Sequence, residues 1–139
     1  MAEAVKATFK FEEFRIPNFF YNESPKGEAT LNISIIPKGI YSQGKFDVEL
    51  ELTARDEDDL NFIIIHVKCI ATFRFDERLP LNEVPSYFYK NSIAITFPYI
   101  RAFISNLTLQ SNTGLIILDL MNLTNLEEEF RNSISEITV

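Results

Sequence analysis

The sequence predicts an α+β domain in which a four-stranded antiparallel sheet is followed by two helices. Up to about residue 75, apolar and polar residues alternate with the two-residue period of strands, and the second half changes to the 3.6-residue period of helices. Short loops separate the alternating segments, and consecutive strands joined by short loops pair antiparallel. We expect the sheet over about residues 7–75 and helices over about 92–110 and 124–136.

The alternation is clearest between Lys45 and Ala54, where polar side chains occupy one face of the predicted strand. The apolar face consists of Phe46, Val48, Leu50, Leu52 and Ala54. A charged hairpin loop at 55–59 leads to a fourth strand from Leu60 to Phe75. Two less regular strands precede these. The first begins at Thr8 and loses its register between residues 14 and 17, and the second covers 29–36 and ends at Pro37.

Two helices are predicted after the sheet. Asn91 or Ser92 is expected to cap the first, which places Pro98 in its early turns, where a missing N–H costs little. Thr124 and Glu127 form a capping box for the second. The apolar stripe of the first helix consists of Ile93, Phe97, Ile100, Phe103, Ile104 and Leu107.

Length and composition indicate one domain over residues 1–139, with 46% apolar residues and thirteen Phe to form its core. The net charge is −7 and no basic run is present, which disfavours nucleic acid and anionic membranes and favours basic partners. No apolar run approaches the ~20 residues of a membrane span, and the first residues lack the apolar core of a secretory signal. We expect a cytoplasmic protein that does not insert into membranes.

Catalytic chemistry is not expected. The acidic clusters at 56–59 and 127–129 lie in a loop and at a helix start, without a nucleophile nearby in the sequence. A single Cys69 and a single His66 cannot form a His/Cys metal site. Four glycines in the chain do not make a phosphate-binding loop. We therefore expect no enzyme activity, no metal and no cofactor.

Three segments outside the expected helices and strands are unusually apolar, at residues 16–21, 87–89 and 115–118. Because loops usually lie at the surface, such segments either cover the sheet, form a subunit interface or stay open to bind an apolar partner. The candidate groove residues for such binding are Phe19, Phe20, Tyr21, Tyr87, Phe88, Tyr89, Leu115 and Ile117.

The stretch ITFPYIRAFISNLTLQSNTGLIILDLMNL, residues 95–123, resembles the Phe-Pro-Tyr-Ala-Arg helix and hydrophobic crossover of SecB, the bacterial protein-export chaperone. The order of four strands, a Pro-containing linker, a long helix and a short acidic helix extends the resemblance over nearly the whole chain. It implies an ATP-independent holdase, assembled as a tetramer from two dimers, that binds unfolded polypeptides in apolar grooves and passes them to the motor SecA. It also implies an oligomer interface containing Phe97, Pro98, Tyr99, Arg101 and Phe103.

The sequence departs from this pattern on the sheet face that would bind the motor. The family has acidic residues on the first and fourth strands, whereas the expected register places Arg15 and His66 at two of these positions, with Glu49 on the same face. Weaker coupling to export follows. Two alternatives stay open: a SecB-like chaperone for another client, such as the antitoxin of a toxin–antitoxin pair, and a carrier of a small ligand or lipid with the crossover lining its pocket.

Overall fold

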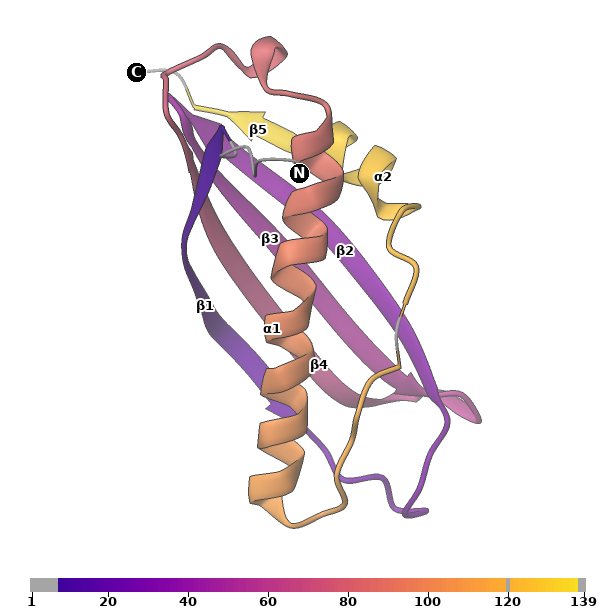
Figure 1. The fold of residues 1–139 in the computed structure, drawn as a ribbon. Coiled ribbons are helices and arrows are strands. Elements are labelled where there is room, and N and C mark those ends of the chain that lie inside the picture. The colour runs from indigo at the N-terminus through magenta and orange to yellow at the C-terminus, as the bar shows by residue number, and fades with distance from the viewer. Residues whose placement is uncertain (1–7, 120, 138–139) are drawn as a thin grey trace, which may run out of the picture.

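The computed structural model describes residues 8–119 and 121–137. The elements in chain order are β1 (Phe9–Tyr21), β2 (Leu31–Ser42), β3 (Lys45–Asp56), β4 (Asp59–Phe75), the 3-10 turn η1 (Leu81–Glu83), α1 (Tyr87–Ser111), α2 (Leu126–Asn132) and β5 (Ile134–Glu136). The strand order in the sheet is β1-β4-β3-β2-β5 (Figure 1). The first four strands pair antiparallel, as predicted, and β5 pairs parallel with β2.

The fold is therefore α+β, but its sheet is five-stranded and mixed, so the predicted four-stranded antiparallel sheet was wrong. The fifth strand comes from a segment that was assigned to the second helix. That helix ends at Asn132, where the Ser133 N–H bonds to the Phe130 carbonyl at 3.0 Å. The chain then extends along β2, and the Ile137 N–H donates to the Tyr41 carbonyl at 2.8 Å.

The core lies between α1 and one face of the sheet, which α1 crosses diagonally in Figure 1. The apolar face predicted for β3 is buried there, and so are Ile65, Val67, Cys69, Ala71 and Phe73 of β4. Ile63, also expected on this face, is half-buried, and Ile64 is buried in its place because the register with β3 shifts between Ala54 and Arg55. Four residues of the predicted helix stripe are also buried, and they are Ile93, Phe97, Ile100 and Ile104. Within the described residues, the opposite face of the sheet carries no helix. We refer to it as the open face.

β1 is longer than predicted because two β-bulges keep it paired with β4. The register shifts between Phe11 and Glu13 and again between Arg15 and Asn18. Each shift places one extra residue on β1 and restores its apolar side chains to the α1 side of the sheet. The segment 16–21, predicted to be a loop, is thus the second half of a strand.

β2 also continues past its predicted end, through Pro37 and Gly39 to Ser42. Proline is tolerated on an edge strand when its nitrogen faces away from the ladder. The Pro37 carbonyl accepts a bond from Ser133 Oγ at 3.0 Å, so this residue faces the edge. A Cβ on Gly39 would lie 2.8 Å from ring carbons of both Phe46 and Phe130, so glycine here lets α2 pack directly on β2.

α1 begins at Tyr87, earlier than predicted, and neither Asn91 nor Ser92 caps it. The reason is Phe88, which is fully buried among the rings of Phe9, Phe46, Phe73 and Phe75, at centroid distances of 4.7–5.5 Å. These ring contacts pack the first turn of α1 against the sheet. Pro98 consequently lies in the helix interior, not in its early turns.

α2 begins at Leu126 with Asn125 as its N-cap residue, and no side chain caps it. The predicted capping box of Thr124 and Glu127 was therefore wrong. The Thr124 hydroxyl instead donates to the Asn122 side chain at 2.7 Å. Phe130 fixes the helix on the sheet through edge contacts with the rings of Phe46 and Tyr89.

Candidate functional site

The crossover, residues 113–119, follows α1 as an extended segment without regular secondary structure, as predicted. Side chains of α1 bind its backbone. Arg101 donates twice to the Leu118 carbonyl, Ser105 Oγ donates to the Ile116 carbonyl at 3.1 Å, and the Ile116 N–H donates to Thr108 Oγ1 at 2.9 Å. These bonds replace a strand partner and hold the crossover extended.

The alternation of an extended chain then separates the crossover side chains. Leu118 is buried and Ile116 is half-buried, both on the side of the core. Leu115 and Ile117 point outward and remain 52% and 66% exposed. Two large aliphatic side chains are thus held at the surface by a backbone that is itself fixed.

A cleft of about 930 Å³ lies between the crossover, the β1–β2 loop and the start of β2. Its volume is in the range of pockets that hold sizeable ligands. The hydroxyls of Tyr21 and Thr113 bond at 2.7 Å and join two of its walls. Its apolar lining consists of Tyr21, Ala29, Leu31, Ile33, Ile64, Leu115, Ile116, Ile117, Leu118 and Met121.

The β2 edge beside this cleft is open. β5 pairs only with Gly39–Tyr41, where the Tyr41 backbone faces outward. Since backbone groups alternate between the two edges of a strand, three residues of the same parity, Leu31, Ile33 and Ile35, also point their N–H and C=O groups outward. No hydrogen bond within the described part of the chain reaches these groups.

Three predicted groove residues, Tyr21, Leu115 and Ile117, come together in this cleft. The others do not line it. Phe19 packs edge-on against Phe103 of α1 at 5.0 Å, and Phe20 lies on the open face.

The aromatic triplet at the start of α1 is divided between surface and core. Tyr87 is exposed and its hydroxyl bonds Thr8 Oγ1 at 2.8 Å. Phe88 and Tyr89 are only 0% and 6% exposed, so the core contains both. Neither residue lines the cleft, because these rings complete the contact between helix and sheet.

The five residues predicted for the oligomer interface occupy different environments in the chain. Phe97 is buried against the sheet and Arg101 holds the crossover, whereas Pro98 is exposed. Tyr99 stacks on Phe14 with ring centroids 4.4 Å apart, and both rings remain partly exposed. A second stacked contact joins Tyr99 to Phe11 at 5.3 Å.

Arg15, Glu49 and His66, predicted to share one sheet face, all lie on the open face. Arg15 pairs with Ile70 across β1–β4, and Ile70 pairs with Glu49 across β4–β3. Arg15, Ile70 and Glu49 therefore form one row across the sheet. Glu49 is bound by Lys68 Nζ at 3.4 Å. His66 Nε2 donates to Glu51 at 2.9 Å, and Phe20 stacks on its ring at 5.4 Å.

The described residues contain no cluster of three or more His, Cys, Asp or Glu side chains that could hold a metal ion. Cys69 is buried, and desolvation raises the pKa of its thiol to about 11. A thiol with this pKa is protonated and a poor nucleophile at neutral pH. No helix in the described ranges has both the length and the hydropathy of a membrane span.

Sequence reasoning missed the β2 side of the cleft, formed by Leu31 and Ile33, and the contributions of Ile64 and Met121. The alternation in residues 29–36 places Leu31 and Ile33 on one face of the strand. The alternation does not show that the outer edge of this strand is unpaired, because that depends on which residues of β2 pair with β5.

Comparison with known proteins identifies relatives of the fold. No protein-family model matches the chain. An uncharacterized protein from Methanocaldococcus jannaschii is 29% identical over 136 residues, covering 88% of this chain and 87% of the relative.

Among solved structures, the SecB-like chaperone Rv1957 of Mycobacterium tuberculosis, in complex with a ChAD peptide from the Rv1956 HigA1 antitoxin, superposes with a TM-score of 0.64. The match has 16% identity and covers 83% of this chain and 88% of the chaperone. A protein of unknown function from Streptococcus agalactiae superposes with a TM-score of 0.50 and 10% identity, over 81% of this chain and 97% of that protein. At these identities the likeness shows the fold, and the fold is similar to that of a SecB-like chaperone.

Proposed function

We propose that the protein is an ATP-independent chaperone that binds extended apolar segments of other polypeptides in the cleft between the crossover and β2. One observation carries this proposal. The cleft places exposed aliphatic side chains, Leu115 and Ile117, beside a strand edge whose backbone donors and acceptors are unpaired.

This combination matches the two needs of an unfolded chain. Its apolar side chains gain free energy when they leave water, at roughly 25 cal/mol per Å². Its backbone N–H and C=O groups need partners when they are desolvated, and the edge residues Leu31, Ile33 and Ile35 can supply these in the geometry of an added strand. Main-chain pairing is independent of sequence, so this part of the contact does not by itself select the client.

The client is proposed to be a specific partner that is not exported, such as an antitoxin. The fold neighbour that supports this choice holds an antitoxin peptide. Transfer of exported preproteins to SecA is the other candidate. Arg15 stands against it, because this basic side chain lies on the open face that the motor would contact.

Assembly into a tetramer, as a dimer of dimers, is also part of the proposal. It is supported by large apolar side chains on the solvent side of α1 and on β1 that the described chain leaves exposed, namely Phe14, Phe19, Ile95, Tyr99 and Leu109. The proposal also includes a cytoplasmic location and a role in binding without catalysis.

Binding of fluorescently labelled unfolded polypeptide, measured by anisotropy without nucleotide, tests the function. Replacing Leu115 and Ile117 together with Ser should weaken binding about tenfold, since each 1.4 kcal/mol of lost apolar contact is one decade. Leu60→Ser is the matched control, because Leu60 is 56% exposed in β4 but lies outside the cleft.

Unchanged affinity in the double variant would refute the cleft as the binding site. A panel of lipids and small apolar ligands tests the carrier alternative. Saturable binding of one panel member, with none of unfolded polypeptide, would replace the chaperone proposal with a carrier. Light scattering should give four chains of 16.1 kDa, and a monodisperse monomer at micromolar concentration would refute the tetramer.

A further inference from the structure

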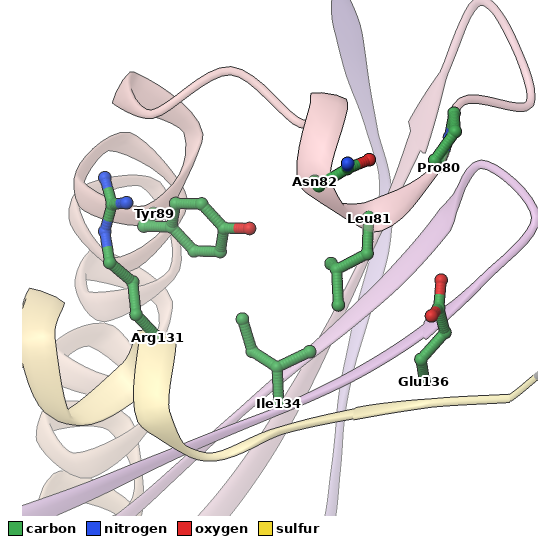
Figure 2. A pocket seen from close by; sticks show the side chains of 7 residues that line it. All are labelled: Pro80, Leu81, Asn82, Tyr89, Arg131, Ile134 and Glu136. Carbon is green, nitrogen blue, oxygen red and sulfur yellow. The ribbon is translucent and has the colours of Figure 1, made fainter.

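A second pocket, of about 470 Å³, lies where β5 meets the segment that follows β4 (Figure 2). It shares no lining residue with the cleft, so the two sites are distinct. The lining residues are Pro80, Leu81, Asn82, Tyr89, Arg131, Ile134 and Glu136. Because the strand that carries Ile134 and Glu136 was predicted to be helix, this pocket was not expected.

Tyr89 directs an unpaired hydroxyl into the pocket. Its ring is fixed by Phe46, Phe88 and Phe130, and only 6% of the residue is exposed. Figure 2 shows the hydroxyl pointing toward the pocket interior, and no hydrogen bond within the described residues reaches it. Among the described residues only His66 Nδ1 is a buried side-chain polar atom without a partner, so the Tyr89 hydroxyl is accessible from the pocket and free to bond a ligand there. Burial raises the pKa of Tyr89, so the hydroxyl is neutral at pH 7 and can accept a bond from a cation.

Arg131 is occupied elsewhere. Its guanidinium carbon lies 4.5 Å from the centroid of the Tyr89 ring, and Figure 2 shows it away from the hydroxyl end. Its Nη2 donates to the Ser86 carbonyl and to Glu127 Oε1, both at 3.0 Å. The Glu127 carboxylate thus compensates the positive charge of Arg131, and the guanidinium is not directed at the empty part of the pocket.

Glu136 provides the negative charge of the pocket. Its carboxylate is exposed at the opposite side from Arg131 (Figure 2), and no basic side chain of the described residues pairs with it. Between these two sides, Leu81 and Ile134 form apolar walls. An apolar passage that ends at a carboxylate and a neutral hydroxyl fits a long stem with a cationic head.

We propose that this pocket binds an aliphatic cation, that is, a protonated amine or guanidinium carried on an apolar stem. The stem packs between Leu81 and Ile134, and the head donates to the Glu136 carboxylate and the Tyr89 hydroxyl. An anion is disfavoured by Glu136, and an uncharged apolar ligand would leave both polar groups without partners.

Two sources carry this chemistry: a Lys or Arg side chain of a bound polypeptide, and a free aliphatic amine. The first source deepens the proposed function and rests on it. It is favoured by position, since β5 pairs with residues 39–41 of β2 while residues 31 and 33 of the same strand line the cleft. The pocket and the cleft therefore lie toward opposite ends of one strand, where one extended polypeptide could contact both.

The test is methyl NMR on the full-length protein with Ile and Leu methyl groups labelled. The probes are an apolar peptide with one Lys, the same peptide with norleucine in place of Lys, and 1,5-diaminopentane. We expect the Lys peptide to shift the Ile134 and Leu81 methyls and to bind about fivefold more tightly than the norleucine peptide, a ratio typical of a partly exposed charged contact. Tyr89→Phe and Glu136→Gln should each reduce this ratio, whereas Glu128→Gln, an exposed α2 residue outside the pocket, should not.

The outcomes separate the two proposals. Shifts at Ile117 with equal affinity for both peptides, and none at Ile134 with any probe, would overturn the cation site and leave the proposed function intact. Shifts at Ile134 with 1,5-diaminopentane alone, reduced by Glu136→Gln, would uphold the site with a free amine as its ligand. If no peptide shifts Ile117, the proposed function fails, and the diamine result still decides on the pocket.

Discussion

The guanidinium of Arg101 in α1 donates two hydrogen bonds to the carbonyl of Leu118, from Nε at 3.1 Å and from Nη2 at 2.8 Å. This bidentate contact joins the long helix to the crossover across 17 residues of sequence. It explains the Arg of the Phe-Pro-Tyr-x-Arg motif within a single chain, without reference to a subunit interface.

Replacing Arg101 should loosen the crossover. Arg101→Met retains an apolar stem but leaves the Leu118 carbonyl without its donors, and bonds from a charged donor are worth about 1.5–3 kcal/mol. We expect a loss of stability of this order in urea unfolding, with faster amide exchange at residues 115–118. Arg101→Lys should show an intermediate loss, because a single ammonium cannot reproduce the two-nitrogen contact. Arg78→Met, at an exposed loop arginine, is the control.

Gly39→Ala should displace α2 from the sheet. The new methyl group would lie 2.8 Å from carbons of Phe46 and Phe130 and 3.2 Å from Ile134, so these side chains must move. Overpacking of this kind costs about 1–3 kcal/mol. Urea unfolding should report the loss, and amide exchange at Ile137, which bonds the Tyr41 carbonyl, should accelerate. Ser34→Ala, on the exposed side of the same strand, is expected to be neutral. Equal stability of the two variants would show that the Gly39 contact adapts without cost.

Sequence patterning predicted those parts of the fold where one face is buried without interruption. β3 alternates throughout and β4 alternates from Ile65 to Phe73, so these inward faces could be read directly. The run of apolar residues before Ile65 has no such alternation, and a register shift there buries Ile64. The second half of β1 was missed because two bulges shift its apolar residues out of a strict two-residue period. The first turns of α1 were missed because Tyr87–Tyr89 contribute aromatic rings to the sheet, a tertiary contact that local propensity does not contain.

The cleft was predicted in part for a similar reason. Leu115 and Ile117 could be identified because an apolar run in a loop is unusual. The open edge of β2 could not, since it follows from the short pairing of β5 with residues 39–41, a contact between distant segments. β5 itself has three residues, too few to produce a period.

Acid should weaken the contact between Glu51 and His66. The hydrogen bond from His66, aided by nearby positive charge, lowers the pKa of Glu51 below its ordinary value of 4.5. A carboxylate with a lowered pKa in the folded state contributes stability above the unfolded pKa and loses it as pH falls through the folded value. The stability difference between the wild type and Glu51→Gln should therefore be largest above pH 4.5 and shrink at lower pH.

Urea unfolding in buffers from about pH 3 to pH 7 measures this difference. Glu57→Gln, at an exposed glutamate of the β3–β4 turn, serves as the control and should show a smaller pH dependence. A Glu51→Gln difference that stays constant down to the lowest pH would contradict the lowered pKa.

Arg15 should weaken the binding of SecA, a partner expected to contact acidic side chains, to the open face. The side chain is exposed and lies in one row with Ile70 and Glu49. Its charge therefore adds repulsion where a negative residue would attract. We expect Arg15→Glu to strengthen binding to a bacterial SecA by up to about fivefold in low salt, the limit set by an exposed pair worth ~0–1 kcal/mol. Calorimetry at two salt concentrations measures it, with the gain disappearing at the higher one.

His66 is left unchanged in this experiment for a structural reason. Its Nε2 lies 2.9 Å from Glu51 Oε1, so His66→Glu would place two carboxylates in contact and remove the stacking of Phe20. Arg78→Glu changes the net charge by the same amount in the loop after β4 and controls for long-range attraction. If Arg78→Glu and Arg15→Glu strengthen binding equally, the effect comes from net charge and not from the open face. Tight binding by the unmodified protein would instead show that SecA tolerates Arg15, and it would favour export over a dedicated client.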